Sequence, residues 1–230
     1  MRRIALYALP LLALTAAKAA PEPALFLTPE KFDPAKLLPP PAAEGTPEAR
    51  AELAFLQAED KVRTTAEATE AAAEGKLKST AVFAGVLGPR FDPATLPVTT
   101  ALFATLRQEE KAAVARAKTH FLRNRPWIVD PKLHSCAPDD EPKTSYPSGH
   151  VSMAYSTAAL LARLMPDKAP QLLDRARTYS QSRIVCEQHF PGDIAAGEAY
   201  GLLITERLME TPAFVARFDA AAAELRSKGL

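Results

Sequence analysis

The sequence has too few of several residues to support some common kinds of site. Among 230 residues there are two cysteines, too few for a disulfide-rich scaffold or a four-cysteine zinc site. The four histidines form no cluster with metal-ligand spacing, so we expect neither a metal nor another cofactor. The 28 basic and 27 acidic residues nearly balance, which gives no reason to expect a surface for nucleic acid or anionic lipid.

Aromatic residues and glycines are also scarce. They number 7% and nine respectively, while alanine and leucine dominate, which favours helix. Hydrophobic residues make up 47% of the chain, enough for a substantial core. No alternating strand pattern of useful length and no internal repeat occurs. The sequence therefore predicts an all-α protein with a single compact multi-helix domain over residues 46–230.

The longest apolar run lies at the start of the chain. Arg2 and Arg3 precede an apolar stretch over residues 4–14, and small residues surround position 19, a pattern typical of a cleaved signal peptide. We therefore expect residues 1–20 to be removed and the protein to be exported to the periplasm. The alternative, a retained anchor, needs about 20 apolar residues, and Pro10 interrupts this run. No other segment is apolar enough to span a bilayer, so no stable membrane insertion is expected.

The two cysteines leave two readings open. An exported chain enters an oxidising compartment, where Cys136 and Cys186 could form a disulfide. Two buried free thiols are the alternative.

Proline and helix-capping residues divide the remainder of the chain. Residues 21–45 are rich in proline, which predicts an extended arm along the surface. Thr46-Pro47-Glu48 is typical of a helix start, and an alanine- and glutamate-rich helical stretch is expected from there to about residue 73. Further helices are expected over 79–87, 97–121 (as one or two), 149–164, 169–186, 191–209 and 212–225, with a long loop over 127–147.

Five residues in three segments could bind a phosphate group. Lys118 and Arg125 lie near the end of one expected helix and Arg183 near the end of another, and these cations suit phosphate oxygens. Ser148 and Gly149 open a helix, where unpaired N–H groups and the helix dipole favour an anion. Together they predict an anion pocket.

Two histidines in the same segments add reactive groups. His189 and Asp193 are four residues apart, and a carboxylate bonded to one ring nitrogen would leave the other free to attack. His150 could give a proton to a departing oxygen. Each residue alone has a structural explanation, such as a surface charge, a turn cap or a local hydrogen bond. His120 and His134 lie outside the segments and are interpreted as structural or surface residues.

The spacing of these residues resembles that of a known family. Eleven residues, in the order Lys-x6-Arg-Pro, Pro-Ser-Gly-His and Ser-Arg-x5-His-x3-Asp, occur within residues 118–193 with every internal spacing intact. This arrangement resembles the type 2 phosphatidic acid phosphatase (PAP2) superfamily, which includes vanadium-dependent haloperoxidases. Within it the chain is most similar to class A bacterial non-specific acid phosphatases, through the Leu-Leu-Pro-Pro-Pro run at 37–41, segment 82–88 and the Ser-Tyr pair before Pro147.

The resemblance implies a PAP2/haloperoxidase-like helical core and a secreted acid phosphatase that needs no metal. Its implied substrates are small-molecule phosphomonoesters, and a homo-oligomer is implied as its assembly. His189 matches the nucleophile that forms a phosphohistidine, Asp193 the residue that orients it, and His150 the general acid that later activates water. The positions that match phosphate ligands are Lys118, Arg125, Ser148, Gly149 and Arg183. Thr144 and Val151 stand where that class usually has Gly and Thr.

Three other functions fit parts of the pattern. A vanadate-dependent haloperoxidase would use much the same pocket, but nothing in the sequence marks a halide site. A membrane lipid phosphate phosphatase would place the motifs between several transmembrane helices. A helical phosphate-binding or structural protein would need His150 and His189 to be incidental. Phosphomonoester hydrolysis with an acidic to near-neutral pH optimum is therefore the function we expect.

Overall fold

The regular structure is helical throughout the part of the chain that the computed structural model describes, residues 23–138 and 141–230. No strand occurs within these residues, and this confirms the predicted all-α fold. None of the described helices has the length and apolar character needed to cross a membrane. The predicted signal peptide, residues 1–20, and its alternative as an anchor lie outside the described residues.

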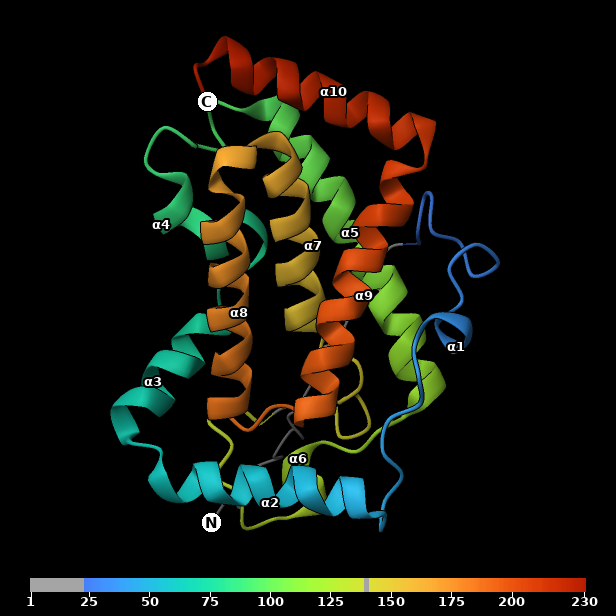
Figure 1. Ribbon diagram of the computed structural model, residues 1–230, viewed down its shortest axis with the longest axis vertical. Coiled ribbons are helices and arrows are strands. Elements are labelled where there is room, and N and C mark those ends of the chain that lie inside the picture. The colour runs from blue at the N-terminus through green and yellow to red at the C-terminus, as the bar shows by residue number, and fades with distance from the viewer. Residues whose placement is uncertain (1–22, 139–140) are drawn as a thin grey trace, which may run out of the picture.

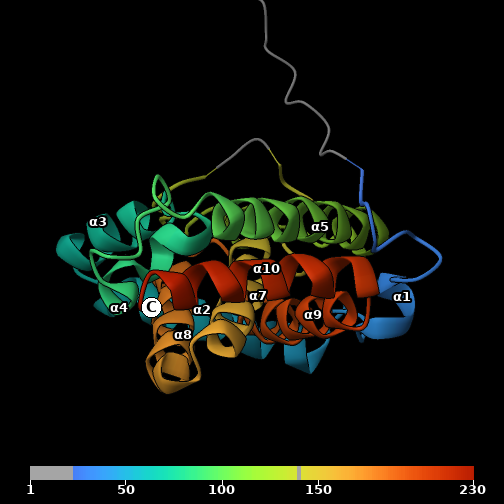
Figure 2. The ribbon, with the colours of Figure 1, turned by 90° about the horizontal axis from the view of Figure 1, so that it is seen from above.

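Four long helices form the centre of the fold, namely α5 (Pro97–Phe121), α7 (Gly149–Leu164), α8 (Ala169–Val185) and α9 (Pro191–Met209). Figure 1 shows α7, α8 and α9 side by side, and Figure 2 shows α5 lying across them as a second layer. Helix α7 contacts the other three. Ala154, Ala158 and Leu161 of α7, which recur at helical spacing, are buried because they face these neighbours.

Two further helices cross the ends of this bundle. Helix α10 (Pro212–Ser227) packs on α5 at the end where α5 begins, and α2 (Pro47–Val62) crosses the opposite end (Figure 1). The remaining elements are α1 (Pro34–Leu37), α3 (Thr65–Glu74), the 3₁₀ helices η1 (Ser79–Phe83) and η2 (Pro166–Lys168), α4 (Ala84–Leu87) and α6 (Pro126–Val129). The expected helix over 79–87 is therefore a 3₁₀ turn followed by an α turn, and the expected loop over 127–147 begins in α6.

The helical stretch expected from Pro47 to about residue 73 consists of two helices, because the chain breaks between α2 and α3. Thr64 caps α3: its Oγ1 accepts from the Glu67 backbone N at 3.2 Å, and the Glu67 carboxylate accepts from the Thr64 backbone N at 2.8 Å. This reciprocal pair starts a new helix in a new direction. The turn sends α3 along α8, towards the start of α7 (Figure 1).

Glycines allow α7 and α9 to approach closely. A Cβ atom on Gly201 of α9 would lie 2.5 Å from the Ser152 carbonyl oxygen of α7, and one on Gly197 would lie 2.8 Å from the Ser148 carbonyl oxygen. Only a residue without a side chain fits at these positions. The contact holds the first turns of α7 and α9 next to each other.

The proline-rich arm is tied to α5. The carboxylate of Glu109, which is buried on α5, accepts from three consecutive backbone amides, those of Leu25, Phe26 and Leu27, at 2.6 to 3.0 Å. The Tyr146 hydroxyl donates to the Pro39 carbonyl at 2.6 Å. The described part of the arm thus runs over the bundle, with α1 as its one helical turn.

Candidate functional site

The ends of four helices meet beside α2. Helices α7 and α9 begin there, while α5 and α8 end there (Figure 1). The three predicted segments are these helix ends and their flanking turns: residues 118–126, 146–150 and 182–193. The fold therefore brings residues together that are distant in the sequence.

His189 lies in the turn between α8 and α9 and is 1% exposed. Its Nδ1 is 2.8 Å from the Ser145 carbonyl oxygen, to which it can donate, and this tautomer leaves a lone pair on Nε2. The Arg125 Nη1 atom lies 2.9 Å from Nε2 and 2.8 Å from the Gln188 carbonyl oxygen. Burial and then the Arg125 charge lower the pKa of His189 to about 3. The ring is therefore neutral, with its basic nitrogen beside a cation.

Asp193 fixes the turn that carries His189. Its Oδ2 is 3.7 Å from Nδ1 of His189, too far for a hydrogen bond, and accepts instead from the Ser145 hydroxyl at 2.6 Å and the Phe190 backbone N at 2.8 Å. Sequence reasoning expected a direct bond between the carboxylate and the imidazole, but the Ser145 carbonyl takes that position. Asp193 acts on His189 by its charge and by holding Ser145.

Arg123 and Glu52 support Asp193 and were not predicted. Arg123 Nη1 is 2.6 Å from Asp193 Oδ1, its Nη2 pairs with Glu52, and its guanidinium lies over the Phe190 ring at 4.3 Å. Glu52, on α2, also accepts from the Gly192 backbone N at 2.6 Å. Burial opposes ionisation of Asp193, but its contacts with His189 and Arg123 outweigh burial and keep its pKa below the ordinary value. Arg123 was not identified from the sequence because the Lys-x6-Arg-Pro pattern specifies only Lys118, Arg125 and Pro126.

The start of α7 provides groups suited to an anion. Ser148 is fully buried, and its Oγ has no hydrogen-bond partner among residues 23–138 and 141–230. A Cβ atom on Gly149 would lie 3.8 Å from Lys118 Nζ, so the lysine side chain ends beside this helix N-terminus. A buried hydroxyl, a glycine and a lysine here match the donors that a phosphate needs.

His150 lies in the first turn of α7 and faces the end of α3. Its Nε2 is 3.1 Å from the Gly75 carbonyl oxygen and 2.5 Å from Lys78 Nζ. Arg183 is next to this carbonyl: its Nη2 donates to the Ala71 carbonyl oxygen, and a Cβ on Gly75 would collide with its guanidinium. Burial, and then the charges of Lys78, Arg183 and His189, lower the pKa of His150 well below its usual value.

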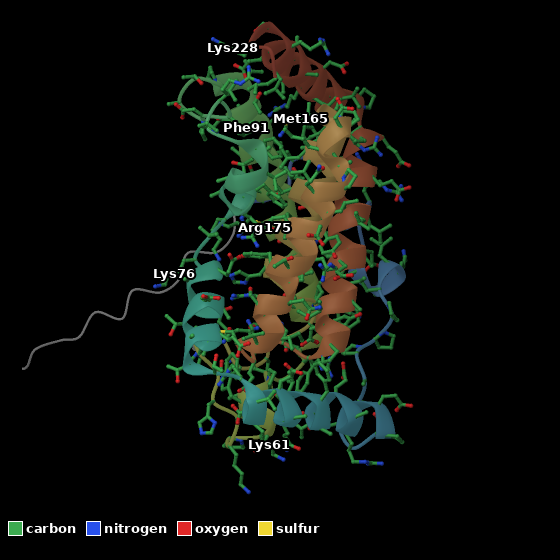
Figure 3. The ribbon with its side chains drawn as sticks, turned by 60° about the vertical axis from the view of Figure 1, so that its left-hand side comes forward. Lys61, Lys76, Phe91, Met165, Arg175 and Lys228 are labelled. Atoms are coloured by element: carbon green, nitrogen blue, oxygen red, sulfur yellow. A yellow bond between two sulfur atoms is a disulfide. The ribbon has the colours of Figure 1, made fainter. Side chains whose placement is uncertain are left out.

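Arg175 fixes the end of α3 against α8. In Figure 3 it lies between these two helices. Its Nη2 is 2.6 Å from a Glu74 carboxylate oxygen, and its Nε donates to the Val82 carbonyl at 2.9 Å. Because Gly75 follows Glu74 directly, Arg175 also locates the carbonyl that faces His150.

All eight predicted catalytic and phosphate-binding residues thus lie at one end of the bundle, in two adjoining groups. His189, Asp193 and Arg125 form the first, with Ser148 joined to it by a hydrogen bond from its backbone N to the Asp193 carbonyl at 3.0 Å. The second comprises His150 and Arg183, and Lys118 ends near Gly149 at the start of α7. A groove of about 480 Å³ adjoins Arg123 and Phe190 but includes none of these eight residues.

The remaining histidines and cysteines lie around this site. Cys136 and Cys186 form a disulfide that ties the loop after α6 to the end of α8. His134 pairs with Asp60 at 2.9 Å, and His120 is exposed at the end of α5. In the described part of the chain, no group of three or more His, Cys, Asp or Glu side chains is placed to hold a metal ion.

Comparisons with known proteins point to one family, and the matched residues include the three segments of the site. A sequence model of the PAP2 superfamily matches residues 94–214, more than half of the chain. A non-specific acid phosphatase of Salmonella typhi is 31% identical over 152 residues, which cover 64% of this chain and 60% of that protein. An acid phosphatase of Zymomonas mobilis is 36% identical over 119 residues, covering 50% and 45%. A non-specific acid phosphatase of Providencia stuartii is 25% identical over 193 residues, covering 80% and 77%. The chain therefore spans less than two thirds of the length of the Salmonella protein.

Proposed function

Because the chain belongs to the PAP2 superfamily, we propose that it is an acid phosphatase that hydrolyses phosphate monoesters through a phosphohistidine on His189. One observation carries this proposal. The unprotonated Nε2 of His189 lies 2.9 Å from Arg125 Nη1. At the same end of the bundle, the buried Ser148 hydroxyl has no hydrogen-bond partner among the residues that the structure describes. A nucleophile, a cation and an anion-binding helix start are the parts that phosphoryl transfer requires.

In the first proposed step the phosphate is held and transferred to the enzyme. Its oxygens are bound by the Ser148 hydroxyl, the first amides of α7 and the three cations Lys118, Arg125 and Arg183. Nε2 of His189 attacks phosphorus, so that an N–P bond forms while the P–O bond to the leaving group breaks. His150 gives a proton to the departing oxygen, which leaves as an alcohol. Arg125 moves from Nε2 to a phosphate oxygen in this step.

In the second proposed step water releases the phosphate. His150, now neutral, takes a proton from a water molecule whose oxygen attacks phosphorus, and the N–P bond breaks. Inorganic phosphate leaves with His189 neutral again. The phosphorylated imidazole carries positive charge, which the Ser145 carbonyl at Nδ1 and the nearby Asp193 carboxylate stabilise.

We further propose that this reaction needs no metal ion. Lys118, Arg125 and Arg183 bring three positive charges to the equatorial oxygens, where charge accumulates in the transition state. The test is a panel of nucleotide, sugar and aryl phosphates assayed with an excess of chelator. Hydrolysis should persist with chelator and be inhibited by vanadate, which mimics five-coordinate phosphorus. Loss of activity in chelator, or peroxide-dependent halogenation on adding vanadate without any hydrolysis, would contradict it.

The proposed location and assembly rest on the sequence alone. Residues 1–20 have the pattern of a signal peptide, so we propose export to the periplasm. Cell fractionation and N-terminal sequencing of the exported protein test this. The homo-oligomer that the family resemblance implies is tested by light scattering, in which a purely monomeric mass would contradict it.

A further inference from the structure

Lys78 contacts the proposed general acid, although it lies outside the three motif segments. It occupies the turn between α3 and η1, and its Nζ is 2.5 Å from His150 Nε2 and 2.6 Å from the Gly75 carbonyl oxygen. The same carbonyl is 3.1 Å from His150 Nε2. Ammonium, imidazole nitrogen and carbonyl oxygen therefore form a closed triangle.

The chemistry of these three groups restricts where protons can be. A lysine ammonium only donates and a carbonyl only accepts, whereas Nε2 accepts when unprotonated and donates when protonated. When Lys78 is charged and donates to both partners, Nε2 must carry the lone pair. If Nε2 is protonated, it can donate to the Gly75 carbonyl. The imidazolium that forms is then positively charged and lies beside the positively charged ammonium of Lys78. A charged Lys78 at this distance therefore opposes protonation of His150.

Arg183 and His189 act in the same direction as Lys78 and lower the pKa of His150. Burial and then the charges of Arg107, Arg183 and Lys111 lower the pKa of Lys78 itself to about 8, which leaves it charged at acidic pH. The titratable groups that face this pair are Arg107, Lys111 and Lys118 of α5, Glu74 of α3, Tyr179 and Arg183 of α8, and His189 before α9.

We propose that Lys78 is a positioning residue for His150: by donating to Nε2 it keeps the imidazole neutral at neutral pH and confines proton donation to acidic pH. In the hydrolysis proposed above, proton transfer to the leaving oxygen requires a protonated His150. The ammonium therefore sets the alkaline limit of turnover. Lys78 keeps its own protons throughout, and the kinetic part of this inference rests on the proposed function.

The first test reads the imidazole itself and needs no catalytic activity. Ring signals of His150 are followed by NMR from pH 3 to pH 9 in protein labelled at histidine, and are assigned by their loss in a His150→Gln variant. In Lys78→Met the titration midpoint of His150 should move upward by about one unit or more, since a neighbouring charge shifts a pKa by that much. Lys78→Arg keeps the charge and should titrate close to the wild type. An unchanged midpoint in Lys78→Met overturns the proposal.

The second test reads the pH profile of kcat/KM. An alkyl phosphate is used because its poor leaving group depends on a proton donor. In Lys78→Met the alkaline limit should move upward with the NMR midpoint. For a shift of one unit, the variant should be about fivefold faster than the wild type at a pH one unit above the wild-type limit. Lys78→Arg should keep the wild-type limit, and in a His150→Ala background Lys78→Met should cause no further shift. A higher KM with an unmoved limit would identify a substrate-binding cation instead and overturn the proposal.

The two tests separate this inference from the proposed function. A chain that hydrolyses no phosphomonoester, yet shows the shifted His150 midpoint in Lys78→Met, refutes the phosphatase and retains the control of His150 by Lys78. Hydrolysis of phosphomonoesters together with an unshifted His150 midpoint in Lys78→Met retains the phosphatase and refutes the control of His150 by Lys78. Because Lys78 is an exposed residue in a turn and only its ammonium group is enclosed by the site, both substitutions should leave the thermal unfolding midpoint within a few degrees of the wild type.

Discussion

Replacing Arg123 with methionine should destabilise the protein strongly, because Arg123 joins two carboxylates at the core of the site. The side chains of Arg123 and Asp193 are 9% and 0% exposed, and their atoms approach to 2.6 Å. Removing one partner of such a buried pair costs about 3 to 5 kcal/mol, since a buried charge is left behind. Asp193 keeps its bonds from Ser145 and Phe190, so we take the lower value, about 3 kcal/mol. For a domain of this size the melting temperature should fall by about 6 to 12 °C.

The assay is thermal unfolding followed by circular dichroism, with a matched surface pair as control. Arg177 pairs with Asp174 at 2.7 Å on α8, but both side chains are at least 60% exposed. Arg177→Met should therefore cost less than about 1 kcal/mol. Acid should reduce the difference between Arg123→Met and the wild type, because Asp193 without its arginine takes up a proton more readily. Equal effects of Arg123→Met and Arg177→Met, or a penalty for Arg123→Met that is the same at pH 7 and pH 4, would refute this reasoning.

Two further predictions concern stability around the site. Burial, helped by the neighbouring Asp60, raises the pKa of Glu187 to about 7, so its protonated form stabilises the fold below pH 4.5 and that contribution is lost as pH rises through 7. Glu187→Gln should thus melt near the wild type at pH 5 but be more stable by about 2 to 3 kcal/mol at pH 8; a difference independent of pH would contradict this. Gly201→Ala should cost about 1 to 3 kcal/mol, since the new Cβ meets backbone atoms of α7, whereas Gly85→Ala, with nothing within 4 Å, should be close to neutral. Equal melting temperatures for the two glycine variants would contradict the close packing of α7 on α9.

The sequence predicted the helices that position the site, because their ends carry strong local signals. The starts of α7 at Gly149 and α9 at Pro191 were predicted to the residue. The break between α2 and α3 was missed, although Thr64 and Glu67 have the Thr-x-x-Glu spacing of a capping box. Alanine and glutamate are abundant on both sides of that break and favour helix there, so the composition of the stretch does not reveal where one helix ends and the next begins.

The motif residues were predicted as a set, whereas the residues that support them were not. Fixed spacing within three short segments marked His150 and His189 as candidates. Glu52 and Lys78 reach the site only because α2 and the turn after α3 fold onto the ends of the long helices, and Arg123, although it lies within the first segment, has its role through Asp193 and Glu52 of other segments. No local pattern encodes such contacts, since they depend on the packing of elements distant in sequence. The position of Asp193 relative to His189 likewise depends on Ser145, which another segment supplies.

The central claim is that His189 becomes phosphorylated during turnover, and trapping the intermediate tests it most directly. Enzyme mixed with a substrate bearing radiolabelled phosphate is quenched within the first turnover in alkali, in which phosphohistidine survives, and the label is located by peptide mapping. The account predicts label on the peptide that contains His189, none in His189→Ala, and undiminished label in His120→Ala, which alters an exposed imidazole at the end of α5. Label on another residue, or wild-type turnover by His189→Ala, would contradict it.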